Sequence, residues 1–242
     1  MKTTTPVPET LTTGIVDIHN DDGAYNLDDF IAGGGVAFIH KITEGRDFVD
    51  KAHAKAVPAA QAKGLLIGLY HFANATDPVT QAEHFLTRAK AFPGALLILD
   101  CEKAPKGSKF GTMNAAQACA FVTRVFEITG RWPVFYTYES MLFSMMKNAT
   151  PEQREVLGRC PLWLAKYGPK PKALPASWGA WTDWFMWQYT SSVLNGPADK
   201  VKYPRGVPGW KRKSQDRSVF RGTVDELRAA WGSVGFPSPC TC

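Results

Sequence analysis

Two carboxylates spaced two residues apart end an apolar stretch of this chain, in the run Ala95-Leu-Leu-Ile-Leu-Asp-Cys-Glu102. Alternate side chains of a β-strand share a face, so Asp100 and Glu102 are predicted to lie together while Cys101 faces the other way. Buried carboxyl groups need a partner or a task. Two that lie side by side push their pKa values apart, so one can give a proton while the other stays ionised. Glycosidic bond cleavage uses such a pair, although a strand that simply ends in water would show the same run.

The elements that must position this pair alternate in type along the chain. Short apolar runs predict strands at Gly14–Ile18, Val36–Ile42, Leu65–His71, Leu96–Glu102, Pro133–Tyr138, Leu162–Tyr167 and Phe185–Thr190. Helical patterns separate the early strands, at Asn26–Ala32, Val49–Lys63, Pro78–Ala91 and Asn114–Thr129. Such alternation is typical of an α/β protein with a parallel sheet. Helical spacers end after about residue 160. We therefore expect a single β/α barrel of the (β/α)5(β)3 type with a β-rich second half.

The ends of the predicted strands carry polar and aromatic side chains. They include Asp17, Glu44, Tyr70-His71-Phe72, Tyr136-Thr-Tyr138, Lys166-Tyr167 and Trp187-Gln-Tyr189. In a barrel of this kind, active residues lie at the carboxyl ends of the strands. Aromatic faces stack on the C–H surfaces of sugars, and acids and amides bond sugar hydroxyls, so this rim suits a polysaccharide. We expect His71, which lies within an apolar strand, to be a hydrogen-bonded structural residue.

Length and composition fit one globular domain of 242 residues with 45% hydrophobic residues. We expect a loose arm over residues 1–13, the barrel over residues 14–235, and a loose tail over residues 236–242 that holds Cys240 and Cys242. Lys2 is not followed by an apolar signal-peptide core, and no apolar stretch approaches 18 residues. These features predict synthesis in the cytoplasm without a signal peptide, no stable membrane insertion, and a monomer.

Positive charge gathers late in the chain, whose formal net charge is +6. The cluster comprises Lys200, Lys202, Arg205, Lys211, Arg212, Lys213, Arg217 and Arg221. Such a face favours an anionic partner such as a lipid surface or a polyanionic cell wall, or it is simply a solvated loop. No nucleic-acid-binding motif accompanies it, so no nucleic acid partner is expected. The five cysteines provide no convincing ligand set, so we expect no metal and no cofactor.

Several short motifs occur in an order that resembles the glycoside hydrolase family 25 lysozymes, the Chalaropsis-type muramidases. The resemblance covers about Gly14 to Gly222. The motifs are Gly14-Ile-Val-Asp17, Lys41-Ile-Thr-Glu-Gly45, Gly68-Leu-Tyr-His-Phe72, Gln81-Ala-Glu-His-Phe85, Leu99-Asp-Cys-Glu102, Leu162-Trp-Leu-Ala165 and Trp187-Gln-Tyr-Thr190. The chain departs from the family at His19-Asn-Asp-Asp-Gly23 and in the basic stretch from Leu194 to Ser214.

The resemblance implies a barrel that ends in β structure and cleaves the β-1,4 bond between N-acetylmuramic acid and N-acetylglucosamine. It implies that Glu102 is the proton donor and that Asp100 orients the substrate's 2-acetamido group. Asp17 would bind and polarise the site, and Asp216 would supply the acid of the last strand. The residues implied to line the sugar subsites are Tyr70, Tyr136, Trp163, Trp187 and Gln188, with Glu44 ordering the loop of the second strand beside them.

The predicted function is therefore a muramidase that acts on bacterial cell-wall peptidoglycan, as a phage endolysin or a delivered antibacterial effector. Such an enzyme would reach the wall after release through a membrane lesion or a secretion machine. One alternative is a glycosidase for another N-acetylated polymer such as chitin. Another is a non-catalytic sugar-binding barrel, which the presence of Asp17, Asp100 and Glu102 disfavours.

Overall fold

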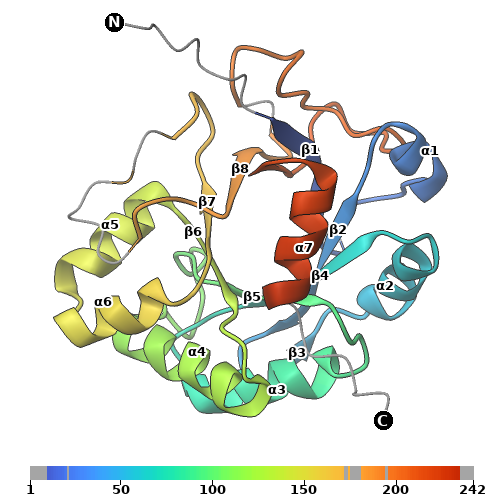
Figure 1. Cartoon of the computed structure of the whole chain (residues 1–242). Helices are drawn as coiled ribbons and strands as arrows, with labels where there is room; N and C mark the ends of the chain where they lie inside the picture. The colour runs from blue at the N-terminus through green and yellow to red at the C-terminus, as the bar shows by residue number, and fades with distance from the viewer. Residues whose placement is uncertain (1–9, 21, 172–173, 175–180, 194–195, 235–242) are drawn as a thin grey trace, which may run out of the picture.

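A closed barrel of eight strands forms the centre of the computed structural model, which describes residues 10–20, 22–171, 174, 181–193 and 196–234 (Figure 1). Parallel neighbours run from β1 to β8, and β1 also pairs with β2. β9 lies antiparallel between β8 and β1 and closes the barrel. The barrel strands are β1 (Leu11–Ile18), β2 (Ala37–Glu44), β4 (Leu66–Phe72), β5 (Leu96–Asp100), β6 (Val134–Tyr138), β7 (Leu162–Ala165), β8 (Met186–Thr190) and β9 (Arg217–Arg221). The short β3 (Phe48–Val49) pairs with the end of β2.

Helices follow the first five barrel strands and cover the outside of the barrel (Figure 1). They are α1 (Leu27–Ala32), α2 (His53–Ala62), α3 (Pro78–Ala89), α4 (Ala115–Thr129), and the pair α5 (Glu139–Asn148) and α6 (Pro151–Gly158). β7, β8 and β9 follow one another without a helix among the described residues. The predicted (β/α)5(β)3 barrel is therefore confirmed, although α5, α6 and the last helix, α7 (Val224–Val234), are additions to the predicted elements.

Each strand divides its side chains between two apolar clusters. In β5, Leu96 and Ile98 point into the barrel, whereas Leu97, Leu99 and the following Cys101 pack outward with the helices. All five are almost completely buried. A strand that is covered on both faces reads as a continuous apolar run, which explains the unbroken hydrophobic stretch before Asp100.

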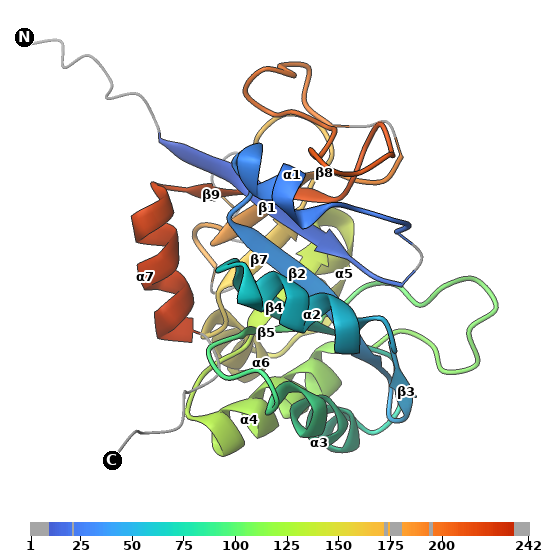
Figure 2. The same ribbon diagram turned by 90° about the vertical axis from the view of Figure 1, so that its right-hand side faces the viewer.

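The helix α7 closes the end of the barrel where the strands begin (Figure 2). Leu227 and Trp231 of this helix belong to the same buried cluster as the inward-facing residues of the strands. The Trp231 indole N–H donates to the carbonyl of Ile67, near the start of β4, at 2.8 Å. The opposite end of the barrel is thereby left as the open face.

The amino-terminal boundary of the barrel differs from the predicted one. β1 begins at Leu11 rather than Gly14, because Leu11 and Thr12 pair with Arg221 and Phe220 of β9. The Thr12 hydroxyl also donates to the Gly222 carbonyl at 2.8 Å. Residues 11–13 are thus part of the sheet and not of a loose arm. The predicted tail, 236–242, lies outside the described residues. None of the helices in the described part is long and apolar enough to span a bilayer.

His71 is held in the outer layer between the sheet and α3. The Gln81 amide nitrogen donates to the carbonyls of Asn74 and Thr76, so its Oε1 is the acceptor for His71 Nε2–H at 3.2 Å. His71 Nδ1 is then left to accept from the Thr43 hydroxyl at 2.8 Å. Burial lowers the pKa of His71 to about 3, so the ring is neutral. These bonds give it the structural role expected from its place in an apolar strand.

Candidate active site

Four acids from three distant parts of the chain line one cavity of about 250 Å³ at the open end of the barrel. Asp17 lies near the end of β1, Asp100 ends β5, and Glu102 follows two residues later. Asp216 directly precedes β9. Because β9 runs antiparallel to its neighbours, its first residues lie at the rim where the other strands end. The structure thus brings together all four acids selected from the sequence.

Gln188 of β8 connects the two sides of the cavity. Its Nε2 donates to Asp17 Oδ2 at 2.9 Å. Its Oε1 accepts from the hydroxyls of Tyr136 at 2.9 Å and Tyr167 at 2.8 Å. The Gln188 side chain is buried, so these bonds fix the orientation of its amide. One amide therefore positions an acid from β1 and a phenol from β6.

Three buried carboxylate oxygens in this site have no hydrogen-bond partner among the described residues. They are the Oδ1 atoms of Asp17, Asp100 and Asp216. Leaving a buried polar atom unpaired costs about 1–3 kcal/mol. Such atoms are rare in folded proteins and call for a specific reason. Their convergence on one cavity is the property expected of a site that awaits the N–H and O–H groups of a ligand.

Burial raises the pKa values of all four acids. For Asp17 the next cause is the negative charge of Asp216, and for Asp100 it is that of Glu102, partly offset by Lys41. The pKa of Glu102 is raised by burial and lowered in part by a hydrogen bond from Tyr136. Burial and the charge of Asp22 raise the pKa of Asp216 to about 7. Carboxyl groups that hold protons near neutral pH are equipped for acid–base chemistry.

Aromatic side chains form the walls of the cavity. Tyr70, Phe72, Tyr136 and Trp163 line it. The rings of Tyr136 and Trp163 meet edge to face with centroids 4.5 Å apart. The Trp163 indole N–H donates to the Ser218 hydroxyl of β9 at 2.9 Å, which holds the ring in place. The result is a rigid pocket with acidic groups and apolar faces, the combination that binds sugars.

Comparison with known proteins identifies the family. The sequence profile of glycosyl hydrolases family 25 matches residues 16–196. The chain belongs to glycosyl hydrolase family 25. Lysozyme M1 of Streptomyces globisporus is 26% identical to this hydrolase over 227 residues, which cover 88% of this chain and 69% of that protein.

Solved structures share the barrel of this family 25 hydrolase. The muramidase from Acremonium alcalophilum matches with a TM-score of 0.68 and 27% identity, covering 90% of this chain and 97% of that one. The catalytic domain of endolysin ply40, from bacteriophage P40 of Listeria monocytogenes, matches with a TM-score of 0.63 over 93% of this chain and 98% of that one. At 19% identity, the endolysin match shows the fold alone.

One predicted subsite residue of the hydrolase is wrong. Trp187 is completely buried in the outer apolar cluster, against Trp184, Tyr189 and Tyr203. Its indole N–H donates to the Lys166 carbonyl at 2.8 Å. The alternation of β8 sends Gln188 inward and its neighbour Trp187 outward. Both faces of β8 are buried, so polarity alone did not distinguish them.

Other residues at the rim were not selected from the sequence. Lys41, Phe72 and His19 line the cavity. Alternation along the strands was the available signal, since Phe72 lies two residues after Tyr70. Glu44, predicted to order the loop of the second strand, is absent from the lining and forms an ion pair with Lys41 at 2.6 Å. Lys41 therefore connects Glu44 to the cavity.

Asp22 lies close to the active site of the hydrolase but is not among the residues that line the cavity. Its Oδ2 accepts from the backbone N–H of His19 at 2.7 Å, and its Oδ1 is paired with Arg212 at 2.9 Å. This acid is therefore committed to the loop after β1. Among the described residues, no three His, Cys, Asp or Glu groups are arranged to hold a metal ion.

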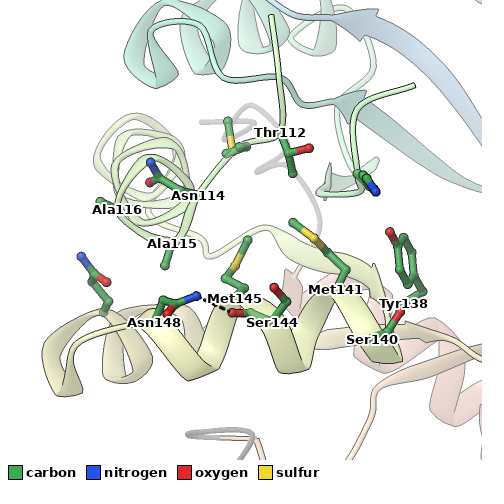
Figure 3. Close-up of a pocket in the computed structure, with 13 residues that line it drawn as sticks. Thr112, Asn114, Ala115, Ala116, Tyr138, Ser140, Met141, Ser144, Met145 and Asn148 are labelled. Atoms are coloured by element: carbon green, nitrogen blue, oxygen red, sulfur yellow. Dashed lines mark hydrogen bonds between the residues drawn. The ribbon is translucent and has the colours of Figure 1, made fainter. Parts of the chain in front are cut away.

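A second cavity of about 650 Å³ begins next to Glu102, at Lys103 and Tyr138 (Figure 3). Figure 3 shows Met141, Ser144 and Asn148 of α5 facing the segment that leads into α4. Its described lining has hydroxyl, amide and thioether groups but no carboxylate and no imidazole. It can therefore contact a ligand, but it lacks the acids and bases that the first cavity provides.

Proposed function

We propose that this family 25 hydrolase is a muramidase, which cleaves the β-1,4 bond between N-acetylmuramic acid and N-acetylglucosamine in peptidoglycan. The observation that carries the proposal is the pair Asp100 and Glu102, both with raised pKa values, in one cavity with an unpaired oxygen of Asp100. The names of the related lysozyme and of the fungal muramidase support the substrate.

The first step depends on where the pair holds its proton. Two neighbouring carboxyl groups of raised pKa share one proton, and the pair titrates as a unit. The acetamido N–H of a bound sugar donates to the unpaired Oδ1 of Asp100, which stabilises the ionised form of Asp100. The shared proton is then held by Glu102. Substrate binding thus sets the pair as one carboxylate and one acid.

Cleavage then proceeds with help from the substrate itself. The acetamido oxygen attacks the anomeric carbon, the bond to the leaving oxygen breaks, and Glu102 gives its proton to that oxygen. The ionised Asp100 stabilises the positive charge that develops on the acetamido group. Water then adds to the anomeric carbon and gives a proton back to Glu102. The product keeps the configuration of the substrate.

The remaining acids hold the sugar rather than transfer protons. Asp17 and Asp216 each present an unpaired Oδ1 to the cavity and can accept from sugar hydroxyls. Gln188 keeps Asp17 in place. Tyr70 and Trp163 provide apolar faces for the ring.

Product analysis tests the proposal. Purified peptidoglycan is digested, the products are reduced with borohydride, and the new ends are identified by mass spectrometry. Reduced muramic acid ends are expected. The Glu102→Gln substitution should lower kcat by about 10²–10⁴-fold, because general acid catalysis contributes that much. Glu83→Gln, an exposed carboxyl of α3 paired with Arg124, is the matched control and should leave kcat unchanged.

The other possible outcomes separate the alternatives. Reduced glucosamine ends would mean a glucosaminidase on the same scaffold. Turnover of chitin oligosaccharides but not of peptidoglycan would mean a different N-acetylated substrate. Binding of peptidoglycan without new ends would mean a sugar-binding barrel. Inversion at the anomeric carbon, seen by NMR in the first product, would exclude the acetamido mechanism.

The biological setting is part of the same proposal. The enzyme acts on the cell wall after release through a membrane lesion, as a phage endolysin does, or after delivery by a secretion machine. The fold shared with the endolysin catalytic domain supports this setting. Expression in a bacterium with and without a co-expressed holin tests it, since lysis should require the holin.

A further inference from the structure

One loop carries almost all of the excess positive charge of the chain. We define the basic segment as residues 196–213, between β8 and β9. It holds six Lys and Arg residues and one acid, Asp199, and so accounts for five of the six net positive charges of the chain. The remainder of the sequence is nearly neutral. Charge so concentrated creates a local positive potential that attracts a polyanion.

Buried side chains fix the basic segment to the barrel. Tyr203, Val207 and Trp210 are buried, and Trp210 stacks on Tyr25 with ring centroids 4.8 Å apart. Three backbone bonds hold its turns: Tyr203 to Asp199, Trp210 to Val207, and Asn26 to Gly209, all at 3.0 Å. The charged side chains are therefore displayed on an ordered surface, which lowers the entropy lost when a ligand binds.

Four lysines of the basic segment face solvent: Lys200, Lys202, Lys211 and Lys213. None of the four forms an ion pair within the described part of the chain. The single acid of the segment, Asp199, accepts from the backbone N–H groups of Val201 and Lys202. This acid closes a turn and leaves the lysine charges available.

The basic segment begins and ends at the rim that holds the catalytic cavity. β8 ends there, and Asp216, which lines the cavity, lies three residues after Lys213. Arg212 also bridges the segment to Asp22 in the loop after β1 at 2.9 Å. A polymer bound along the segment would therefore lie beside a glycan chain in the cavity.

We propose that the basic segment binds a phosphodiester polymer of the bacterial cell wall and thereby holds the enzyme on its substrate. The proposal rests on the proposed function, because the polyanion must occur where the peptidoglycan occurs. Phosphodiesters in a row match lysine ammonium groups, which bind phosphate as point charges. Binding by such exposed charges weakens as salt screens them, with a Debye length of about 8 Å at physiological ionic strength.

The test compares one loop variant with a variant of equal charge. The loop variant is Lys200→Gln/Lys202→Gln/Lys211→Gln/Lys213→Gln. The control is Lys51→Gln/Lys55→Gln/Lys90→Gln/Lys147→Gln, which removes four exposed lysines at or near α2, α3 and α5. Three substrates are used: walls that carry their phosphodiester polymer, the same walls after hydrofluoric acid has removed it, and soluble glycan fragments. Pelleting measures binding, and release of reducing ends measures turnover.

We expect the wild type and the control to bind and cleave polymer-bearing walls about tenfold better at low salt than stripped walls. The loop variant should lose this advantage, and added salt should remove it from the wild type. All three proteins should cleave soluble fragments equally. That arm separates the two proposals, because failure of every protein on fragments would refute the muramidase and not the loop.

Three results would overturn the proposal. One is equal wild-type activity on stripped and polymer-bearing walls. Another is an equal loss in the loop and control variants, which would indicate net charge alone. The third is wild-type binding to anionic phospholipid vesicles but not to walls, which would assign the basic segment to a membrane surface.

Discussion

At the scale of single residues, the site depends on one neutral amide among four acids. Gln188 accepts from two phenols and donates to Asp17, so it adds no charge while it orders both sides of the cavity. Tyr136 has a second task, because its hydroxyl also stabilises the ionised form of Glu102. Two tyrosines thus make the same contact with Gln188 but differ in their effect on the proposed proton donor.

That difference gives a pH prediction. Tyr136→Phe removes a hydrogen bond to the charged form of Glu102, so the pKa of Glu102 should rise. The acid form then persists to higher pH, and the alkaline limb of the kcat profile should move upward. Tyr167→Phe is the control, because it removes an equal bond to Gln188. A limb that moves equally in both variants would contradict the assignment.

Asp216 gives a prediction for stability. Its pKa in the folded protein is about 7, against an ordinary value of 3.8. Between these values the folded state binds more protons than the unfolded state, so this stabilising contribution is complete below pH 3.8 and is lost as the pH rises toward 7. Asp216→Asn should therefore raise the free energy of unfolding at pH 8 by on the order of 2 kcal/mol, and not at pH 3.5.

Denaturant unfolding at the two pH values measures this effect. Asp225→Asn is the control, since this acid is exposed on α7. The same gain at both pH values would mean that the asparagine helps by packing and that the carboxyl is not strained by burial. Activity should fall in the Asp216 variant, because a stabilising change in a site acid removes a group that awaits substrate.

At the scale of elements, predictability depended on how many faces of each element are buried. The run before Asp100 was predictable, because β5 is buried on both faces and its apolar sequence has no breaks. The same property made β8 ambiguous and led to the wrong assignment of Trp187. Alternation from Gln188, which had to face the site, would have corrected it.

The helix α7 left a local signal that was not used. Thr223 and Glu226 form a capping box, in which each side chain bonds the backbone N–H of the other residue. This pattern predicts a helix start but gives no information about where the helix packs. Its place beneath the barrel follows from long-range contacts such as Trp231 with Ile67, which no local pattern encodes.

The role of α7 can be measured. Trp231→Ala should lower the free energy of unfolding by about 3–5 kcal/mol, because it empties a buried aromatic site at the base of the barrel. The kcat at temperatures below the transition should stay near the wild-type value, since the site lies at the other end. Phe143→Ala, a half-exposed ring on α5, should change stability little. A comparable loss in both variants would contradict the role of α7 as a base.

At the scale of the whole molecule, the barrel is closed by its two chain ends. β9 pairs with β1 through Leu11 with Arg221 and Thr12 with Phe220, contacts that span almost the entire sequence. The family resemblance supplied Asp216 and a last strand, but the antiparallel placement between β8 and β1 came from the structure. Tertiary closure of this kind has no signature in a short window.

Removal of β9 should therefore abolish folding and not merely activity. A chain that ends at Asp216 keeps every other strand but leaves β1 and β8 with unpaired edges. We expect aggregation and loss of amide protection in β1, measured by hydrogen exchange. The Trp231→Ala variant, in which the barrel stays closed, should retain that protection. A soluble truncated chain with protected β1 amides would show that closure is not required.

The late arrival of β9 also has a consequence during synthesis. A nascent chain on the ribosome contains Asp17, Asp100 and Glu102 long before it contains Asp216 and the strand that closes the barrel. Until translation has passed Arg221, these acids are not yet held around one cavity. The order of the elements along the messenger RNA therefore delays enzymatic activity until synthesis is nearly finished, without any separate inhibitor.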